Sequence, residues 1–115
     1  MQIDKEVLKG HIDTIILSLL LKQDLYGYEL SKMARQKSLH SFDLKEGTMY
    51  LSLKRMENNG YIESYWGEDG NKGGRRKYYR ILSPGKERLL LKKQEWVLVN
   101  QILKSFLEEE EHEEN

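Results

Sequence analysis

Basic side chains gather near residue 75, where their charge could bind phosphate groups. The stretch from 70 to 80 contains no acidic residue, and its five basic residues are Lys72, Arg75, Arg76, Lys77 and Arg80. Four glycines lie within it or just before it: Gly67, Gly70, Gly73 and Gly74. Glycine lets a backbone approach a partner closely, and clustered cations neutralise phosphates. We therefore predict that residues 67–77 form a phosphate-binding loop, although a solvated loop would carry the same charge.

A second set of candidate contacts lies at 46–59. Met49, Leu53 and Met56 recur at the spacing of one helical face. The side chains around that face that could reach phosphates or base edges are Thr48, Tyr50, Ser52, Lys54 and Arg55. Ordinary surface residues would show the same pattern. The basic loop that follows is the feature that favours a DNA-binding function. Tyr26 could also donate its hydroxyl to a phosphate, with packing in the core as its other interpretation.

These residues must be positioned by helices and a hairpin. Apolar spacing predicts helices over 5–22, 26–38 and 46–59, with a very short strand at Phe42 and Leu44. Two runs rich in aromatic and β-branched residues, 61–66 and 77–82, predict a hairpin around the basic loop. Ser83 and Pro84 then favour the start of a last helix that ends near Leu107.

This order predicts a mainly α fold with a small β-hairpin, a winged helix-turn-helix followed by a C-terminal dimerisation helix. We expect a DNA-binding domain over 1–83, the dimerisation helix over 84–107 and a disordered acidic tail over 108–115. In such folds the second helix of the motif, here 46–59, lies in the major groove. The hairpin loop 67–77, the wing, would contact phosphates or the minor groove.

The formal net charge of zero conceals an uneven distribution. Six of the 19 acidic residues lie in the tail, so residues 1–107 hold 19 basic against 13 acidic residues, a net charge of +6. There are no cysteines, the first residues show no signal peptide, and no apolar run is long enough for a membrane span. We expect a cytoplasmic protein that does not contact a membrane.

The residues resemble the PadR family of transcriptional regulators. The resemblance is carried by 46–57, 59–62 and 73–80, and by two shorter segments at 10–13 and 26–30. Leu51 departs from it, since many members have a proline there. The resemblance implies a homodimeric repressor, and a dimer matches a palindromic operator on double-stranded DNA.

The last helix independently favours dimerisation, because its apolar residues recur at heptad-like spacing. We expect it to pack on its mate, on the first helix, or on both. The residues expected in the dimer interface are Ile12, Leu89, Trp96, Val99, Leu103 and Phe106.

Trp96 also raises the question of an effector. In a multidrug-binding member of the family's short, two-part branch, a tryptophan at this place pairs with its symmetry mate, and flat aromatic compounds stack between the two. By similarity, Leu8, Ile15, Lys92 and Asn100 would line the same region. The alternative is that Trp96 only fills the dimer interface. Lys92 and Asn100 favour neutral or anionic planar aromatics over cationic ones.

An enzyme and a protein-interaction module are the alternatives to a DNA-binding regulator. The three histidines, His11, His40 and His112, show no nucleophile or metal-ligand spacing. The sequence therefore predicts no enzyme, no metal site and no cofactor. A winged helix can also serve as a protein–protein interaction module without an effector, and the basic loop argues against that alternative.

Overall fold

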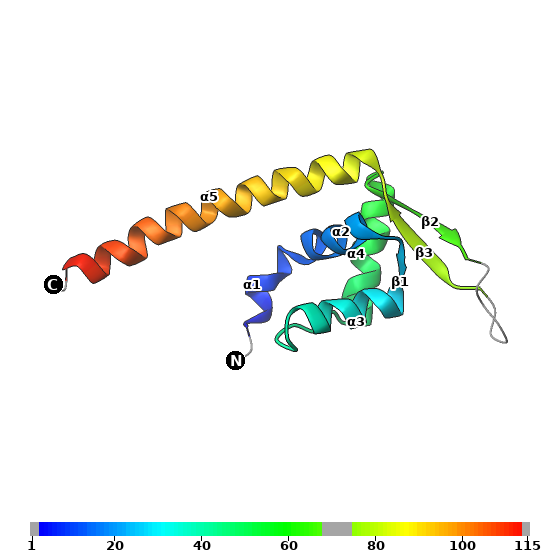
Figure 1. The fold of residues 1–115 in the computed structure, drawn as a ribbon, viewed down its shortest axis with the longest axis horizontal. Helices are drawn as coiled ribbons and strands as arrows, with labels where there is room; N and C mark the ends of the chain where they lie inside the picture. Colours follow the sequence, from blue (N-terminus) through cyan, green and yellow to red (C-terminus); the bar gives the residue numbers. More distant parts are fainter. Residues whose placement is uncertain (1–2, 68–74, 114–115) are drawn as a thin grey trace.

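The computed structural model describes residues 3–67 and 75–113 (Figure 1). Within them the chain forms, in order, α1 (Lys5–Lys9), α2 (Ile12–Lys22), β1 (Leu25–Tyr26), α3 (Gly27–Lys37), α4 (Glu46–Asn58), β2 (Ile62–Trp66), β3 (Lys77–Ile81) and α5 (Ser83–Glu113). The predicted class, a mainly helical winged helix-turn-helix with a C-terminal helix, is confirmed.

The first helix differs from the prediction, because 5–22 is not continuous. α1 ends at Lys9 and α2 begins at Ile12. At the break the His11 amide donates to the Leu8 carbonyl at 2.8 Å, and the His11 carbonyl accepts from Ile15 at 3.0 Å. Gly10 stands at this break, and glycine is among the poorest residues at continuing a helix.

The sheet has three antiparallel strands in the order β1-β3-β2. In β2 and β3, Ile62 lies opposite Ile81 and Trp66 opposite Lys77, while Leu25 of β1 lies opposite Tyr79. The strand expected at Phe42 and Leu44 is absent from the described residues. Those side chains pack inward from a loop instead, and the short segment before α3 pairs with the free edge of β3.

The core lies where α2, α3 and α4 meet the inner face of the sheet. Its fully buried side chains include Ile16, Leu20, Leu30, Leu53 and Met56. Met49, Leu53 and Met56 fix which side of α4 faces inward, and Ile62, Tyr79 and Ile81 do the same for the hairpin. The core therefore fixes the position of α4 relative to the hairpin.

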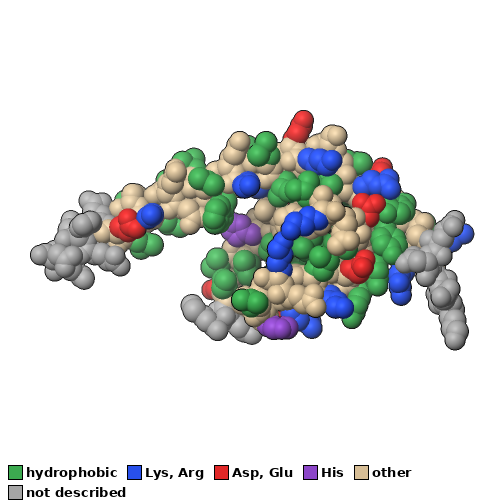
Figure 2. All heavy atoms as spheres, in the orientation of Figure 1, with side chains coloured by type: hydrophobic (Ala, Val, Ile, Leu, Met, Phe, Trp, Pro, Cys, Tyr) green, Lys and Arg blue, Asp and Glu red, His purple; other side chains and the backbone are tan. Residues whose placement is uncertain are grey.

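α5 leaves this body after its first turns and extends away from it (Figure 1). Its start is packed tightly, because a side chain at Gly85 would overlap the backbone carbonyl of Tyr61. Beyond Leu89, which packs on the core, hydrophobic side chains along α5 lie exposed, as Figure 2 shows.

α5 is longer than the last helix that we predicted, which was to end near Leu107. The helix continues to Glu113, into the segment 108–115 that we expected to be an acidic tail. Glutamate has a high intrinsic helix propensity, and each residue added to an existing helix gains a hydrogen bond. Lys104 also pairs with Glu108 one turn later, at 3.7 Å.

Candidate nucleic-acid interface

α4 is built to present one side to a partner. It begins after Lys45 and ends at Asn58 with Asn59 as its C-cap, and Gly60 then turns the chain with φ of +77°, a left-handed conformation that suits glycine. The exposed side chains include Thr48, Tyr50 and Lys54. These three expected contacts are therefore accessible to DNA.

Ser52 corrects the prediction for this helix. Its side chain is only 1% exposed, and its hydroxyl donates to Asp13 of α2. Met49, Ser52 and Met56 fall on one face at intervals of three and four residues, so Ser52 faces inward despite its polarity. Buried in this way, it is not placed to contact DNA.

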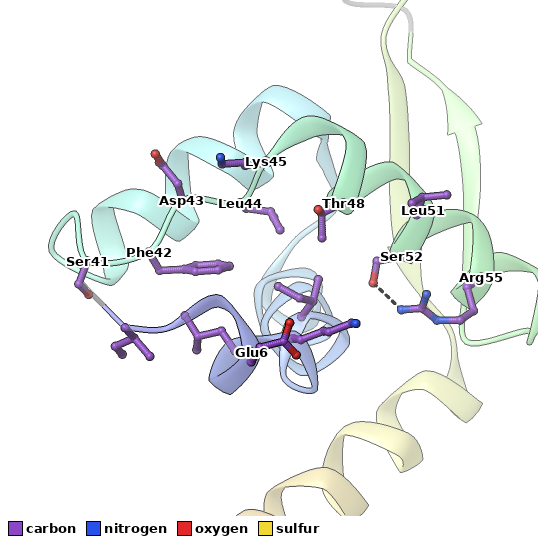
Figure 3. A pocket seen from close by; sticks show the side chains of 14 residues that line it. Glu6, Ser41, Phe42, Asp43, Leu44, Lys45, Thr48, Leu51, Ser52 and Arg55 are labelled. Atoms are coloured by element: carbon purple, nitrogen blue, oxygen red, sulfur yellow. Dashed lines mark hydrogen bonds between the residues drawn. The ribbon is translucent and has the colours of Figure 1, made fainter. Parts of the chain in front are cut away.

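Arg55 lies between the buried side and the exposed side of α4. Its Nη2 donates to Asp13 at 2.6 Å and to the Ser52 hydroxyl at 3.1 Å (Figure 3), while more than half of the side chain is exposed. Asp13, which sequence reasoning missed, thus joins α2 to α4. No local pattern marks it, because Ser52 lies 39 residues away.

A groove of about 400 Å³ separates α4 from the hairpin. It is lined by Tyr50, Lys54, Glu57, Asn58, Lys77 and Tyr79. Lys54 and Lys77 bring positive charge to it from the helix and from β3. Burial raises the pKa of Tyr79 to about 12. The groove thus combines two expected cationic contacts.

Tyr50 depends on a glycine at the start of α3. A side chain at Gly27 would overlap the Tyr50 hydroxyl, so the tyrosine ring covers the helix N-terminus closely. Gly27 is buried and Tyr50 stays exposed. The pair therefore sets Tyr50 at the groove.

Tyr26 belongs to an aromatic cluster at the base of the wing. Its ring lies edge-on to Tyr78 with centroids 5.4 Å apart, and Tyr78 stacks on Tyr65 at 5.7 Å. The guanidinium carbon of Arg76 lies 4.8 Å from the Tyr26 centroid, a cation–π contact. Both expected roles of Tyr26 remain compatible with this, since the ring packs and is only partly buried.

Asp24 ties the same cluster to the hairpin. It accepts from the Tyr65 hydroxyl at 2.5 Å and from Arg80 Nε at 3.3 Å. The hydrogen bond to Asp24 raises the pKa of Tyr65, and the bond to Glu63 raises that of Arg80. Arg80 also lies 4.6 Å over the Tyr65 ring. Arg80 is therefore held in the stem of the wing.

The stem of the wing closes with a hydrogen bond from the Gly67 amide to the Arg76 carbonyl, 2.8 Å long. Arg75, Arg76 and Lys77 follow the loop and are exposed. Lys72, another expected contact, lies outside the described residues. The wing residues that the structure describes are thus accessible at one end of the molecule.

The expected ligand and dimer residues are spread over the chain. On α5, Asn100 donates to the Trp96 carbonyl at 3.0 Å and Lys92 pairs with Glu95 at 3.3 Å. The exposed residues are Trp96, Val99, Leu103 and Phe106. Leu89 and Ile15 pack on the core. Ile12 is 8% exposed, so it is a core residue rather than the interface contact we expected.

A pocket of about 660 Å³ lies between α1, the loop before α4 and α4 itself (Figure 3). Its apolar lining includes Leu8, Phe42 and Leu51, with Thr48 and Arg55 at the α4 side. Leu8 is the one expected ligand residue among its described lining residues. A single chain therefore does not assemble the expected effector site in this pocket.

No group of three or more His, Cys, Asp or Glu side chains among the described residues is arranged to hold a metal ion. None of the helices described is both long and apolar enough to cross a membrane.

Comparisons with known proteins converge on one family. The transcriptional regulator PadR-like family model matches residues 16–90. A transcriptional regulator from Clostridium thermocellum is 44% identical, with a TM-score of 0.83, over 90% of this chain and 97% of that one. A PadR family regulator from Clostridium difficile is 49% identical, with a TM-score of 0.75, over 85% and 99%. An uncharacterized protein from Lysinibacillus sphaericus is 44% identical over 90% of this chain and 94% of that protein.

Proposed function

Because the chain belongs to the PadR-like family of transcriptional regulators, we propose that it works as a homodimeric repressor of a palindromic operator. Membership in the family makes it a DNA-binding regulator and not an enzyme. The proposal adds how it holds DNA, how it assembles and what controls it. We place it in the cytoplasm, where a bacterial regulator meets its operator.

The groove between α4 and the wing carries the proposal for DNA. Lys54 approaches it from α4 and Lys77 from β3, and Arg75 and Arg76 continue the charge along the wing. With α4 in the major groove, the wing would lie beside the flanking phosphates. Thr48, Tyr50 and Arg55 are the further candidates for contact from the helix.

Selection of bound sequences from random duplex DNA tests this assignment. We expect an inverted repeat whose half-sites lie about one helical turn apart, as for other dimeric helix-turn-helix proteins. If no DNA sequence is enriched while the same preparation still binds a protein partner, the result favours the alternative of a protein–protein interaction module.

We propose that a second copy of the chain binds through α5. Its exposed apolar side chains, Trp96, Val99, Leu103 and Phe106, recur at three- and four-residue intervals along one side of the helix. Helices of this kind pair because water otherwise covers a large apolar area. A homodimer would cover that side and bring two copies of α4 to one duplex.

We also propose that a ligand controls DNA binding. Trp96 is 58% exposed in the single chain, and a pair of such rings across a dimer could hold a planar aromatic compound. Lys92 and Asn100 lie on the same helix, and neutral or anionic aromatics are the class proposed. Titration of Trp96 fluorescence with such compounds should quench it, whereas unchanged emission would leave Trp96 as an interface residue only.

A further inference from the structure

Trp66 ends β2 with 59% of its surface exposed. Alternate residues of a strand point to the same face, so Ile62, Ser64 and Trp66 share one side of the hairpin. Ile62 is buried in the core, and the Ser64 hydroxyl donates to Glu57 of α4 at 2.8 Å. Trp66 therefore points to the side of the sheet on which α4 lies.

The cross-strand partner of Trp66 is Lys77, which lines the groove beside α4. The next residue of β3 on that face, Tyr79, is buried. Trp66 and Lys77 thus form the first pair beyond the core on the α4 side. They are paired across the strands at the base of the wing, and the Lys77 ammonium lies 5.9 Å from the centroid of the Tyr79 ring.

The surroundings of Trp66 suit DNA better than an apolar protein surface. Arg75 lies two residues before Lys77 and both are exposed, and covering cations with an apolar surface is costly. A duplex offers phosphates to the cations and the carbon face of deoxyribose to the indole. The end of the hairpin formed by β2 and β3 also lies far from the C-terminal part of α5 (Figure 1), where the exposed apolar side would meet a second copy.

We propose that Trp66 is a DNA contact, packing its indole on the sugar backbone beside the phosphate that Lys77 neutralises. The proposal rests on the proposed function, since it assumes that α4 and the wing face the same duplex. Because the indole is uncharged and touches sugar, its contribution is largely independent of base sequence. It differs from the cationic wing residues in not releasing counterions.

Fluorine NMR of the full chain labelled with fluorotryptophan tests the contact directly. The chain has two tryptophans, and Trp66→Phe assigns their resonances. On titration with duplex DNA the Trp66 resonance should shift, while fluorescence anisotropy of the labelled duplex follows complex formation. An unshifted Trp66 resonance in a saturated complex overturns the proposal and leaves DNA binding intact. Absence of a complex overturns both.

Affinity measurements on variants supply a second readout. Trp66→Ala should weaken binding about tenfold, the size of one lost aromatic contact, with an unchanged dependence on salt. Trp66→Phe should retain most of the affinity, because a flat ring remains. Leu39→Ala, which truncates an exposed apolar side chain away from the wing, is the control. Wild-type affinity in folded Trp66→Ala overturns the contact.

Discussion

At the scale of single residues, partly buried Asp13 fixes the position of the helix that we propose contacts DNA. Its Oδ1 accepts from the Ser52 hydroxyl and from Arg55 Nη2. Removal of the carboxylate leaves the buried hydroxyl without its acceptor, which costs more than the net gain of an ordinary hydrogen bond. The link therefore matters for the position of α4 as well as for stability.

Asp13→Ala should accordingly lower the free energy of unfolding by about 1–2 kcal/mol. Urea denaturation at one fixed protein concentration measures this change. The control is Lys104→Ala, because the Lys104–Glu108 pair is exposed and such pairs contribute about 0–1 kcal/mol. If both substitutions lower the free energy of unfolding equally, the hydrogen bonds of Asp13 contribute no more stability than the exposed ion pair.

At the scale of helices and strands, most of the architecture could be predicted, and the departures have local causes. The face of α4 was evident from Met49, Leu53 and Met56. The apolar pattern that predicted one helix over 5–22 carries no information on where the backbone bends, and the break falls at Gly10. β1 was missed because Leu25 and Tyr26 pair with β3, more than 50 residues away, through contacts that no local pattern records.

The same limit applies to the candidate site. Charge and glycine content sufficed to predict exposed cations at Arg75, Arg76 and Lys77. Ser52 was misassigned because its polarity suggested solvent, although its spacing from Met49 and Met56 was available as a signal. Asp24 and Asp13 could not be predicted, since their partners come together only when the helices and the hairpin pack.

Two glycines provide a matched test of element packing. Gly85→Ala should destabilise the chain by about 1–3 kcal/mol, because a side chain there overlaps the Tyr61 backbone, which cannot yield easily. At Gly10 a side chain meets open space, so Gly10→Ala should be neutral or stabilising by up to about 1 kcal/mol. Thermal unfolding of both variants measures the difference. A neutral Gly85→Ala would contradict the close packing of α5 on Tyr61.

At the scale of the whole molecule, the two ends carry different surfaces. The wing presents cations at one end, and α5 carries exposed hydrophobic side chains toward the other (Figure 2). Self-association through α5 would leave both wings free. Each dimer would then present two copies of the positively charged segment 1–107 to DNA.

Leu103→Asp should shift the protein from dimer to monomer, because it places a charge within the apolar side of α5 proposed to be covered. Analytical ultracentrifugation at micromolar concentration measures the shift. Ser105→Asp puts the same charge on the other side of the helix, among mostly polar neighbours, and should leave the dimer intact. If wild type itself sediments as a monomer, the proposed assembly is wrong.

We propose that α4 and the cationic wing jointly bind one DNA duplex. This joint binding is tested most directly by fluorescence anisotropy of labelled duplex DNA with wild type and with the Arg75→Ala, Arg76→Ala double variant, over a salt series. We predict that wild-type affinity falls steeply with salt, and that the double variant binds all sequences more weakly with a salt slope smaller by about 2. Wild-type affinity and slope in the double variant would contradict the account.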